Sequence, residues 1–375
     1  MSKKVIVIGG GIVGASTAYY LAKQGAAVTL IDRNDQGQAT DAAAGIICPW
    51  ISQRRNKDWY QLAKSGAALY TKLIAELKSL GETNTGYEKV GAISLHTETK
   101  KLEGMVERAT KRKETAPEIG EISTLNESET LNRVPILKEG YRSVYISGAA
   151  RVNGQELLQA LKRAGKLKGV KIIEGDASLS IEDNQIKGVH VDNQYTLPAD
   201  KVILANGAWM SELVKPFGID LQVFPQRAQI THVKLPGVDT TKWPVIMPPG
   251  NQYMLSLPDN RIVLGSTYED NVGFDYRITA GKVHEILDKA FNIAPELENS
   301  TVVETKVGFR PFTPGSLPIV GPLHQIKGVY LANGLGGTGL TMGPFVGQQL
   351  AKIALGELPD IELENYDVSK AIASQ

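Results

Sequence analysis

Residues 3–32 read KKVIVIGGGIVGASTAYYLAKQGAAVTLID, and this stretch decides the fold. Residues 3–8 form a short apolar run rich in β-branched side chains, which is typical of a buried parallel strand. After a glycine turn, residues 12–25 repeat apolar side chains at helical spacing and end in Gly25. Residues 27–32 then read as a second strand. The order of strand, glycine turn, helix and strand predicts the first half of a Rossmann unit.

The glycine turn has the spacing G-x-G-x-x-G at Gly9, Gly11 and Gly14. The first glycine allows a tight turn, the second lets a pyrophosphate approach the backbone, and the third lets the helix pack on the strand. Asp32 closes the second strand and can accept a hydrogen bond from a ribose hydroxyl. The pattern predicts a bound dinucleotide, without separating NAD from FAD. The contacts that we expect here are with Gly9, Gly11, Ile12, Val13, Gly14, Asp32 and Arg33.

Length and composition limit the alternatives. The chain has 375 residues, which favours two domains. Its 41 Lys and Arg against 40 Asp and Glu give no overall attraction to nucleic acid or to an anionic membrane. No run reaches the roughly 18 apolar residues of a membrane span, and glycines break the apolar start that would mimic a signal peptide. We therefore expect a cytoplasmic protein, peripheral at the inner membrane face only if it reduces a quinone.

The chain does not continue as an NAD domain. Residues 40–45, TDAAAG, are small enough for a flat group to lie on their backbone, although a tightly packed helix start explains them equally well. Residues 58–80 predict a long amphipathic helix whose apolar side is core. Residues 151–165 predict a helix, with Asn153 and Glu156 spaced as a capping box.

The segment that follows separates the two cofactor classes. Residues 170–175 predict another buried strand, and residues 178–198 contain three short alternating strands joined by Asp-Asn turns. A further apolar strand, residues 201–205, leads into Asn206 and Gly207. This meander resembles the FAD domain of the glutathione-reductase-like superfamily. We therefore predict an α/β fold, with a glutathione-reductase-like FAD-binding Rossmann domain and an α+β substrate domain that has a mixed or antiparallel sheet.

A second G-x-G-x-x-G occurs at Gly334, Gly336 and Gly339, again between a strand and a helix. A second nucleotide site is one interpretation. However, only 19 residues follow Gly356, and they offer no apolar strand to complete another unit. The backbone N–H groups of this turn are better suited to the pyrimidine end of the same flavin.

Five motifs together resemble the FAD-dependent D-amino acid oxidase family. They occur in the order VIVIGGGIVGASTAYYLAKQG, TDAAAGIICP, VILANGAW, VGFRPFTPGSLPIVGP and LANGLGGTGLTMGPFVGQQLA, and span nearly the whole chain. Within the family the chain resembles bacterial glycine oxidases and, more closely, D-amino acid dehydrogenases. The resemblance implies a discontinuous FAD-binding domain of residues 1–85, 143–210 and 305–375, and a substrate-binding domain of residues 86–142 and 211–304.

The resemblance also implies a set of site residues. Arg310, in the G-x-R-P segment, would hold the substrate carboxylate, with Tyr253 sharing it and Tyr268 lining the pocket. Without a carboxylate in the substrate, that arginine would need an acidic partner elsewhere in the chain. The further flavin contacts would be Thr40, Ala43, Ala44, Gly45, Ile46, Ile47, Ala177, Asn206, Gly207, Trp209, Arg310, Gly336, Gly337, Thr338, Gly339, Leu340 and Thr341.

Two departures from relatives stand out. Asp41 would bring a charge near the phosphates, and Gly337 replaces the arginine of glycine oxidase. No cysteine follows Arg310, so FAD should be bound non-covalently, and Cys48 is expected to be a buried structural thiol. We expect no metal site. None of the five histidines is expected to lie in a glycine loop or beside an acid.

The implied enzyme is an FAD-dependent oxidoreductase that acts on the CH–NH₂ or CH–NH group of donors. A D-amino acid would pass a hydride from its α-carbon to flavin N5, giving an imino acid and then a 2-oxo acid and ammonia. Alternatives are a glycine or sarcosine oxidase, a 2-hydroxy-acid oxidoreductase, and a flavin-binding subunit without turnover. The electron acceptor would be O₂ or a quinone, a homo-oligomer is possible, and no nucleic-acid partner is expected.

Overall fold

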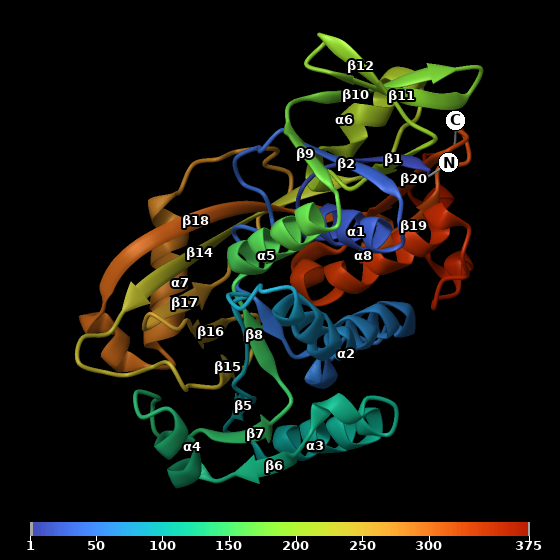
Figure 1. Cartoon of the computed structure of the whole chain (residues 1–375). Coiled ribbons are helices and arrows are strands. Elements are labelled where there is room, and N and C mark those ends of the chain that lie inside the picture. Colours follow the sequence, from blue (N-terminus) through green and yellow to red (C-terminus); the bar gives the residue numbers. More distant parts are fainter. Residues whose placement is uncertain (1–2, 374–375) are drawn as a thin grey trace.

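The computed structural model describes residues 3–373 (Figure 1). A six-stranded sheet forms one half of the molecule, with the order β19-β20-β13-β1-β2-β9. All neighbours in it are parallel except β19 and β20, which are antiparallel. The strands are β1 (Lys4–Ile8), β2 (Ala27–Asp32), β9 (Lys171–Glu174), β13 (Lys201–Leu204), β19 (Ile319–Pro322) and β20 (Val329–Asn333).

Both faces of this sheet are buried, because successive side chains of a strand point to opposite sides. Val5 and Val7 of β1 pack in the core on the helical side, whereas Ile6 and Ile8 pack on the other side. The helical side carries α1, α5 and α8, with α2 stacked against α8 (Figure 1). These helices are α1 (Ile12–Lys23), α2 (Lys57–Ser79), α5 (Gly154–Leu167) and α8 (Gly339–Leu355).

Glycine lets α1 and α8 approach closely. A Cβ at Gly347 of α8 would lie 2.7 Å from the Cβ of Ser16 and 2.8 Å from the carbonyl oxygen of Val13, both on α1. Neither distance leaves room for a side chain, so the contact requires glycine. It joins the helices that follow the two glycine turns and fixes the spacing between those turns.

The other face of the sheet is covered by a three-stranded antiparallel meander of β10 (Ala177–Glu182), β11 (Gln185–Val191) and β12 (Tyr195–Pro198). Its two turns have positive φ at Asp183, Asn184, Asp192 and Asn193, as the Asp-Asn turns predicted. The short helix α6 (Met210–Val214) packs on the same side. The parallel sheet, the meander and the returning strand β13 confirm the predicted fold class.

An eight-stranded sheet forms the other half, with the order β18-β14-β17-β16-β15-β5-β7-β6. It is antiparallel except between β15 and β5, so it is a mixed sheet, as predicted. Its strands are β5 (Ala92–His96), β6 (Ile122–Leu125), β7 (Arg142–Ile146), β14 (Phe224–Lys234), β15 (Val245–Met247), β16 (Tyr253–Ser256), β17 (Arg261–Gly265) and β18 (Thr301–Phe312). The helices packed around it are α3 (Thr99–Lys113), α4 (Glu127–Arg133) and α7 (Ala280–Phe291).

A small sheet lies between the halves and consists of β3 (Ile46–Ile47), β8 (Ala150–Val152) and β4 (Tyr87–Lys89). Strands β7 and β18 belong to the eight-stranded sheet, whereas the predicted boundaries at 143 and 305 give most of each strand to the FAD-binding segments. The division into two domains remains a prediction. If β7 and β18 are assigned to the same domain as the rest of their sheet, both strands belong to the substrate-binding domain, and the boundaries at 143 and 305 move accordingly. None of the helices within residues 3–373 is long and apolar enough to cross a membrane.

Two local predictions were wrong. Strand β9 is not buried: Lys171 and Glu174 are exposed, because β9 is the edge strand of its sheet. The capping box at Asn153 is incomplete. Its side chain accepts from the N–H groups of Gln155 and Glu156, but its own N–H donates to the carbonyl of Gly86, 2.9 Å away, and not to the Glu156 side chain.

Candidate active site

A cavity of about 870 Å³ runs between the two halves, past the carboxyl ends of β1, β2, β13 and β20. Every residue predicted to contact the flavin or the substrate lines it, except Gly14 and Ile47. A Cβ at Gly14 would lie 1.8 Å from the carbonyl oxygen of Gly9. Gly14 therefore lets α1 pack closely against the glycine turn, beneath the cavity. Ile47 is 1% exposed and packs in the core. The contact set remains a prediction, and these two positions lie behind the cavity lining.

The first glycine turn ends where α1 begins. Gly9 has φ +99°, and a Cβ there would lie 2.6 Å from the backbone of Ala205. The N–H of Ile12 donates to the Thr40 hydroxyl at 3.0 Å, and no acidic residue occupies the first turn of α1. Gly11 provides no side-chain cap, so a helix N-terminus without its own acid remains suited to phosphate.

Asp32 lies beside this turn. Its carboxylate is 3.5 Å from the ammonium of Lys162, and the side chain of Lys162 is 18% exposed. A Cβ at Gly10 would lie 2.3 Å from Asp32 Oδ2, so Gly10 is required for the carboxylate to reach its place. The prediction missed Gly10 and Lys162. The run of three consecutive glycines could have indicated Gly10. No feature of the sequence near Lys162 indicated that it approaches Asp32.

The small-residue loop forms the part of the cavity wall next to the first turn, which it contacts through Thr40. Gly45 has φ +88°, and a Cβ there would lie 1.8 Å from the carbonyl oxygen of Val152. Asp41 does not line the cavity. Its carboxylate accepts from Gln155 and lies 4.0 Å from the ammonium of Lys306. Asp41 therefore keeps its charge outside the lining of the cavity in which the phosphates are predicted to bind.

The second glycine turn opens into the same cavity and does not form a separate site. Asn333 holds it, because its amide donates to the carbonyl of Gly207 at 2.8 Å while its oxygen accepts from the N–H of Gly334 at 2.7 Å. The first turn of α8 contains no acidic residue. The buried Oδ1 of Asn206 has no hydrogen-bond partner within residues 3–373. This free acceptor and the open helix N-termini fit a polar cofactor such as FAD.

Cys48 is buried and also lines the cavity. Burial raises the pKa of its thiol to about 12, so it stays protonated at neutral pH.

Arg310 reaches the cavity from β18. Its guanidinium donates to Ser266 Oγ at 2.7 Å, to Gln226 Oε1 at 3.2 Å and to the carbonyl of Thr267 at 3.4 Å. It lies 4.7 Å from the centre of the Tyr268 ring. All these partners are neutral, and within residues 3–373 the guanidinium forms no ion pair. Its charge is therefore available to an anionic ligand.

The two predicted tyrosines differ in exposure. Tyr268 is 48% exposed, so it forms the outer edge of the pocket around Arg310. Tyr253 is half-buried, with its hydroxyl near Arg310 and Ser266. Burial raises the pKa of Tyr253, although the nearby Arg310 opposes this shift. Its hydroxyl is thus a neutral hydrogen-bonding group at neutral pH.

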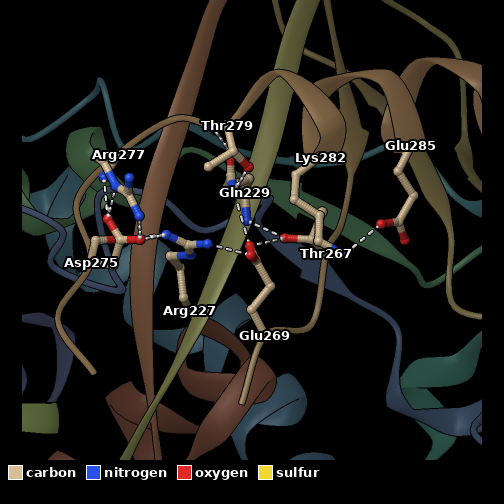
Figure 2. A network of polar contacts seen from close by, with 9 residues as sticks. All are labelled: Arg227, Gln229, Thr267, Glu269, Asp275, Arg277, Thr279, Lys282 and Glu285. Carbon is tan, nitrogen blue, oxygen red and sulfur yellow. Dashed lines mark hydrogen bonds and ion pairs between the residues drawn. The ribbon is translucent and has the colours of Figure 1, made fainter. Parts of the chain in front are cut away.

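A buried polar network holds the segment that binds Arg310 (Figure 2). Glu269 accepts from Arg227 at 2.5 Å, from Gln229 at 2.9 Å and from the Thr267 hydroxyl at 3.1 Å. Arg227 also pairs with Asp275. Burial alone would raise the pKa of Glu269, but the hydrogen bonds from Arg227 and its neighbours outweigh it and lower the pKa. The network fixes the backbone at Thr267, whose carbonyl accepts from Arg310.

The prediction that no histidine lies beside an acid was wrong. Nδ1 of His232 on β14 is 3.1 Å from Oε1 of Glu304 on β18. The imidazole is 5% exposed and does not line the cavity. Burial lowers the pKa of His232 to about 4 despite the nearby carboxylate. It is therefore a neutral core residue at physiological pH.

Known proteins resemble the whole chain. It is 55% identical over 372 residues to an uncharacterized oxidoreductase, YurR, of Bacillus subtilis (strain 168), covering 99% of this chain and 100% of the relative. The crystal structure of iminodiacetate oxidase (IdaA) from Chelativorans sp. BNC1 is 41% identical, with a TM-score of 0.94 over 97% of this chain and 98% of that one. The glycine oxidase of Pseudomonas aeruginosa PAO1 is 30% identical over 387 residues, covering 98% of each chain.

The model of one protein family matches residues 4–353, and its description reads FAD dependent oxidoreductase (DAO). The glycine turns, Asp32 and the free Asn206 oxygen agree with the cofactor in that description. The chain belongs to the DAO family of FAD-dependent oxidoreductases.

Proposed function

We propose that this protein oxidises the α-carbon–nitrogen bond of a small amino acid whose carboxylate binds Arg310. One observation carries the proposal: the guanidinium of Arg310 has only neutral partners in a cavity whose other end has the features of a dinucleotide site. A planar guanidinium can bind both carboxylate oxygens and thereby fix the orientation of the α-carbon. Gln226, Ser266 and Thr267 fix the guanidinium itself.

FAD, when bound, supplies the acceptor for the electron pair and hydrogen that leave the α-carbon. The adenosine end would lie near Asp32 and Ala177, and the flavin end near residues 40–46 and the second glycine turn. The N-terminus of α8 would stabilise negative charge at that end. The protein's own part is to position the substrate and to prepare this electrostatic environment.

No side chain of the cavity wall is suited to take a proton from the substrate amine. The lining residues within 3–373 include no His and no Lys, and the acidic ones are Asp32, Asp35, Asp176 and Glu212. Of these, Asp32 is the predicted ribose ligand, and the other three all pair with Arg33. The substrate must therefore bind as the neutral amine or release its proton to water. The imine product then hydrolyses in water to a 2-oxo acid and ammonia, or to a 2-oxo acid and a primary amine where the nitrogen carries a substituent.

Two substrate classes are proposed. A D-amino acid is the sequence prediction. A glycine with a substituent on its nitrogen, such as sarcosine or iminodiacetate, is favoured by the similarity to iminodiacetate oxidase and by the space at Gly337. A Cβ at Gly337 would lie 3.7 Å from Nε of Arg310, so the space beside the guanidinium is open to the substrate.

Anaerobic mixing with a panel of compounds tests the function. The panel contains glycine, sarcosine, iminodiacetate, D- and L-amino acids, and the hydroxy acids glycolate and lactate. We expect an amine to bleach the flavin absorbance and the hydroxy acids to leave it unchanged. Reoxidation by air or by a quinone then identifies the electron acceptor. Bleaching by hydroxy acids alone would contradict the proposal, and no bleaching by any compound would favour a subunit without turnover.

A further inference from the structure

A group of arginines without ion pairs lies around residues 49–54, behind one part of the cavity wall, and none of these arginines is itself a lining residue. This segment contains the 3-10 helix Pro49–Ile51 and leads into α2. Pro49 and Ser52 line the cavity, as does Trp59 in the first turn of α2. The segment is therefore part of the wall, on the side formed by α2.

Three arginines in or next to this segment donate to backbone carbonyls. Arg112 donates to the carbonyls of Trp50 at 2.7 Å and Ser52 at 2.8 Å, and Arg108 donates to that of Ile51 at 3.3 Å. Arg54 donates to the carbonyl of Ser316. None of these three guanidiniums forms an ion pair with a carboxylate of residues 3–373. Their positive charges lie behind this part of the wall and favour an anion there.

Arg54 contacts a lining residue, Trp59, although its own side chain does not line the cavity. Its guanidinium carbon lies 4.9 Å from the centre of the Trp59 ring, and the indole N–H of Trp59 donates to Thr338 Oγ1 at 3.3 Å. Thr338 follows Gly337, the position beside Arg310. A continuous set of contacts thus joins Arg54 to Arg310 along one wall.

The guanidinium of Arg54 has unused hydrogen-bonding capacity. It is half-buried, and burial lowers its pKa. A guanidinium has five N–H donors, but within the described chain one hydrogen bond is found, to a neutral carbonyl. A partly desolvated cation without a counter-ion is costly, and an anionic ligand would offset that cost.

We propose that Arg54 binds a second acidic group of the substrate, so that the enzyme prefers amino acids with an additional carboxylate. The inference rests on the proposed function, in which Arg310 binds the first carboxylate. The two arginines would hold the ends of the substrate and leave its amine between them. The alternative is that Arg54 only joins residue 316 to Trp59 as a structural contact.

The closing experiment compares pairs of compounds that differ by one carboxylate. Sarcosine and iminodiacetate serve as substrates, and D-alanine and D-aspartate form a second pair with the extra carboxylate on the side chain. (Methylthio)acetate and thiodiacetate, which lack the amine, serve as ligands. Binding of the thioethers is measured through the flavin absorbance and needs no turnover. The variants are Arg54→Gln and Arg54→Lys, and the matched control is Arg55→Gln, which removes the same charge from the exposed neighbouring residue.

We expect the wild type to prefer the dicarboxylate in at least one substrate pair and to bind thiodiacetate more tightly than its partner. Arg54→Gln should reduce both preferences roughly 10- to 100-fold, the scale of one hydrogen bond between charged groups. Arg54→Lys should restore part of the preference, and Arg55→Gln should leave it unchanged. Monocarboxylate turnover should change little in all variants.

Other results would overturn the inference. If Arg54→Gln and Arg55→Gln give the same ratios, or if the wild type does not distinguish the compounds, Arg54 does not bind the substrate. In that case continued oxidation of any amine leaves the proposed function intact. If no amine reduces the flavin, the proposed function fails, and the thioether titration still decides whether Arg54 binds an acid. If Arg54→Gln loses its flavin, Arg54→Lys decides the question. A preference for thiodiacetate below that of the wild type supports the binding role, and an unchanged preference rejects it.

Discussion

The guanidinium of Arg227 lies 2.5 Å from the carboxylate of Glu269, and the two residues are 5% and 8% exposed. The pair joins β14 to the segment after β17, and that segment provides two of the three hydrogen-bond acceptors of Arg310. A buried ion pair is a weak source of stability but costly to break. Its position behind the substrate-binding arginine therefore indicates a role in positioning that arginine.

We expect Glu269→Gln to fold with a free energy of unfolding lowered by roughly 1–3 kcal/mol, the cost of leaving buried donors without their charged partner. Because Thr267 would lose its fixed place, KM for the amino acid should rise several-fold while kcat changes less. Denaturant unfolding and steady-state kinetics measure both effects. The control is Glu285→Gln, a partly exposed member of the network in Figure 2 that does not contact Glu269. A destabilised variant with unchanged KM would show that the pair is only structural.

His232 should make the protein sensitive to mild acid. Burial holds its pKa at about 4, below the roughly 6.5 of an unfolded histidine. Its neutral form is thus favoured by folding, and this contribution is present above about pH 6.5 and lost as the pH falls towards 4. Between pH 8 and pH 5 the wild type should lose roughly 1–2 kcal/mol through this residue. We expect His232→Gln to lose less over the same range in urea unfolding. Equal losses would assign the acid sensitivity to other groups.

Asp32→Ala should weaken FAD binding by about 1–3 kcal/mol, the scale of a hydrogen bond to a charged acceptor. Glu174→Ala is the matched control, because Glu174 pairs with Asp32 in register on the adjacent strand β9 and does not line the cavity. Titration of the apoprotein with FAD measures both affinities. If Asp32→Ala binds FAD as tightly as Glu174→Ala does, the ribose is held by other residues.

The flavin should leave the protein on acid precipitation, because no cysteine follows Arg310 and Cys48 keeps its proton at neutral pH. The expected result is a colourless pellet and one equivalent of FAD per chain in the supernatant, measured by absorbance. Yellow colour that stays in the pellet would show a covalent bond, and mass spectrometry of peptides that contain Cys48 would then locate it.

The sequence predicted those features that depend on local geometry. The two glycine turns are set by backbone conformation and close approach, as Gly9 and Gly45 show, and such requirements are visible in residue type. The Asp-Asn turns of the meander were visible for the same reason. Arg310 stood out because a single charge in an apolar segment requires an explanation.

Features that depend on distant partners could not be predicted. Arg227 and Glu269 are 42 residues apart, and only the pairing of β14 with the segment after β17 brings them together. His232 meets Glu304 through the register between β14 and β18. Strand β9 looked buried from its composition, but its place at the edge of the sheet decides its exposure. In each case the deciding contact comes from the topology and not from the neighbouring residues.

Arg310 gives the most direct test of the proposed reaction. It is half-buried, it has neutral hydrogen-bond partners, and its guanidinium carbon lies 4.7 Å from the centre of the Tyr268 ring. A structural arginine at this depth would be paired with a carboxylate, as Arg227 is with Glu269. Because Arg310 has no such partner in the described chain, replacing it should leave the fold and the flavin in place.

We expect Arg310→Leu to stay yellow and to lose roughly 3–5 kcal/mol in kcat/KM, the scale for breaking a desolvated ion pair. Arg310→Lys should recover only part of that loss, because an ammonium cannot bind both carboxylate oxygens in one plane. Flavin reduction rates against amino-acid concentration measure both variants. The matching amines without a carboxylate are the control, and their reduction rates should be nearly the same in wild type and Arg310→Leu. If Arg310→Leu keeps its preference for the acid over the amine, the carboxylate binds elsewhere. If it loses the flavin or does not fold while Arg310→Lys does, the charge of Arg310 supports the structure in spite of its neutral partners.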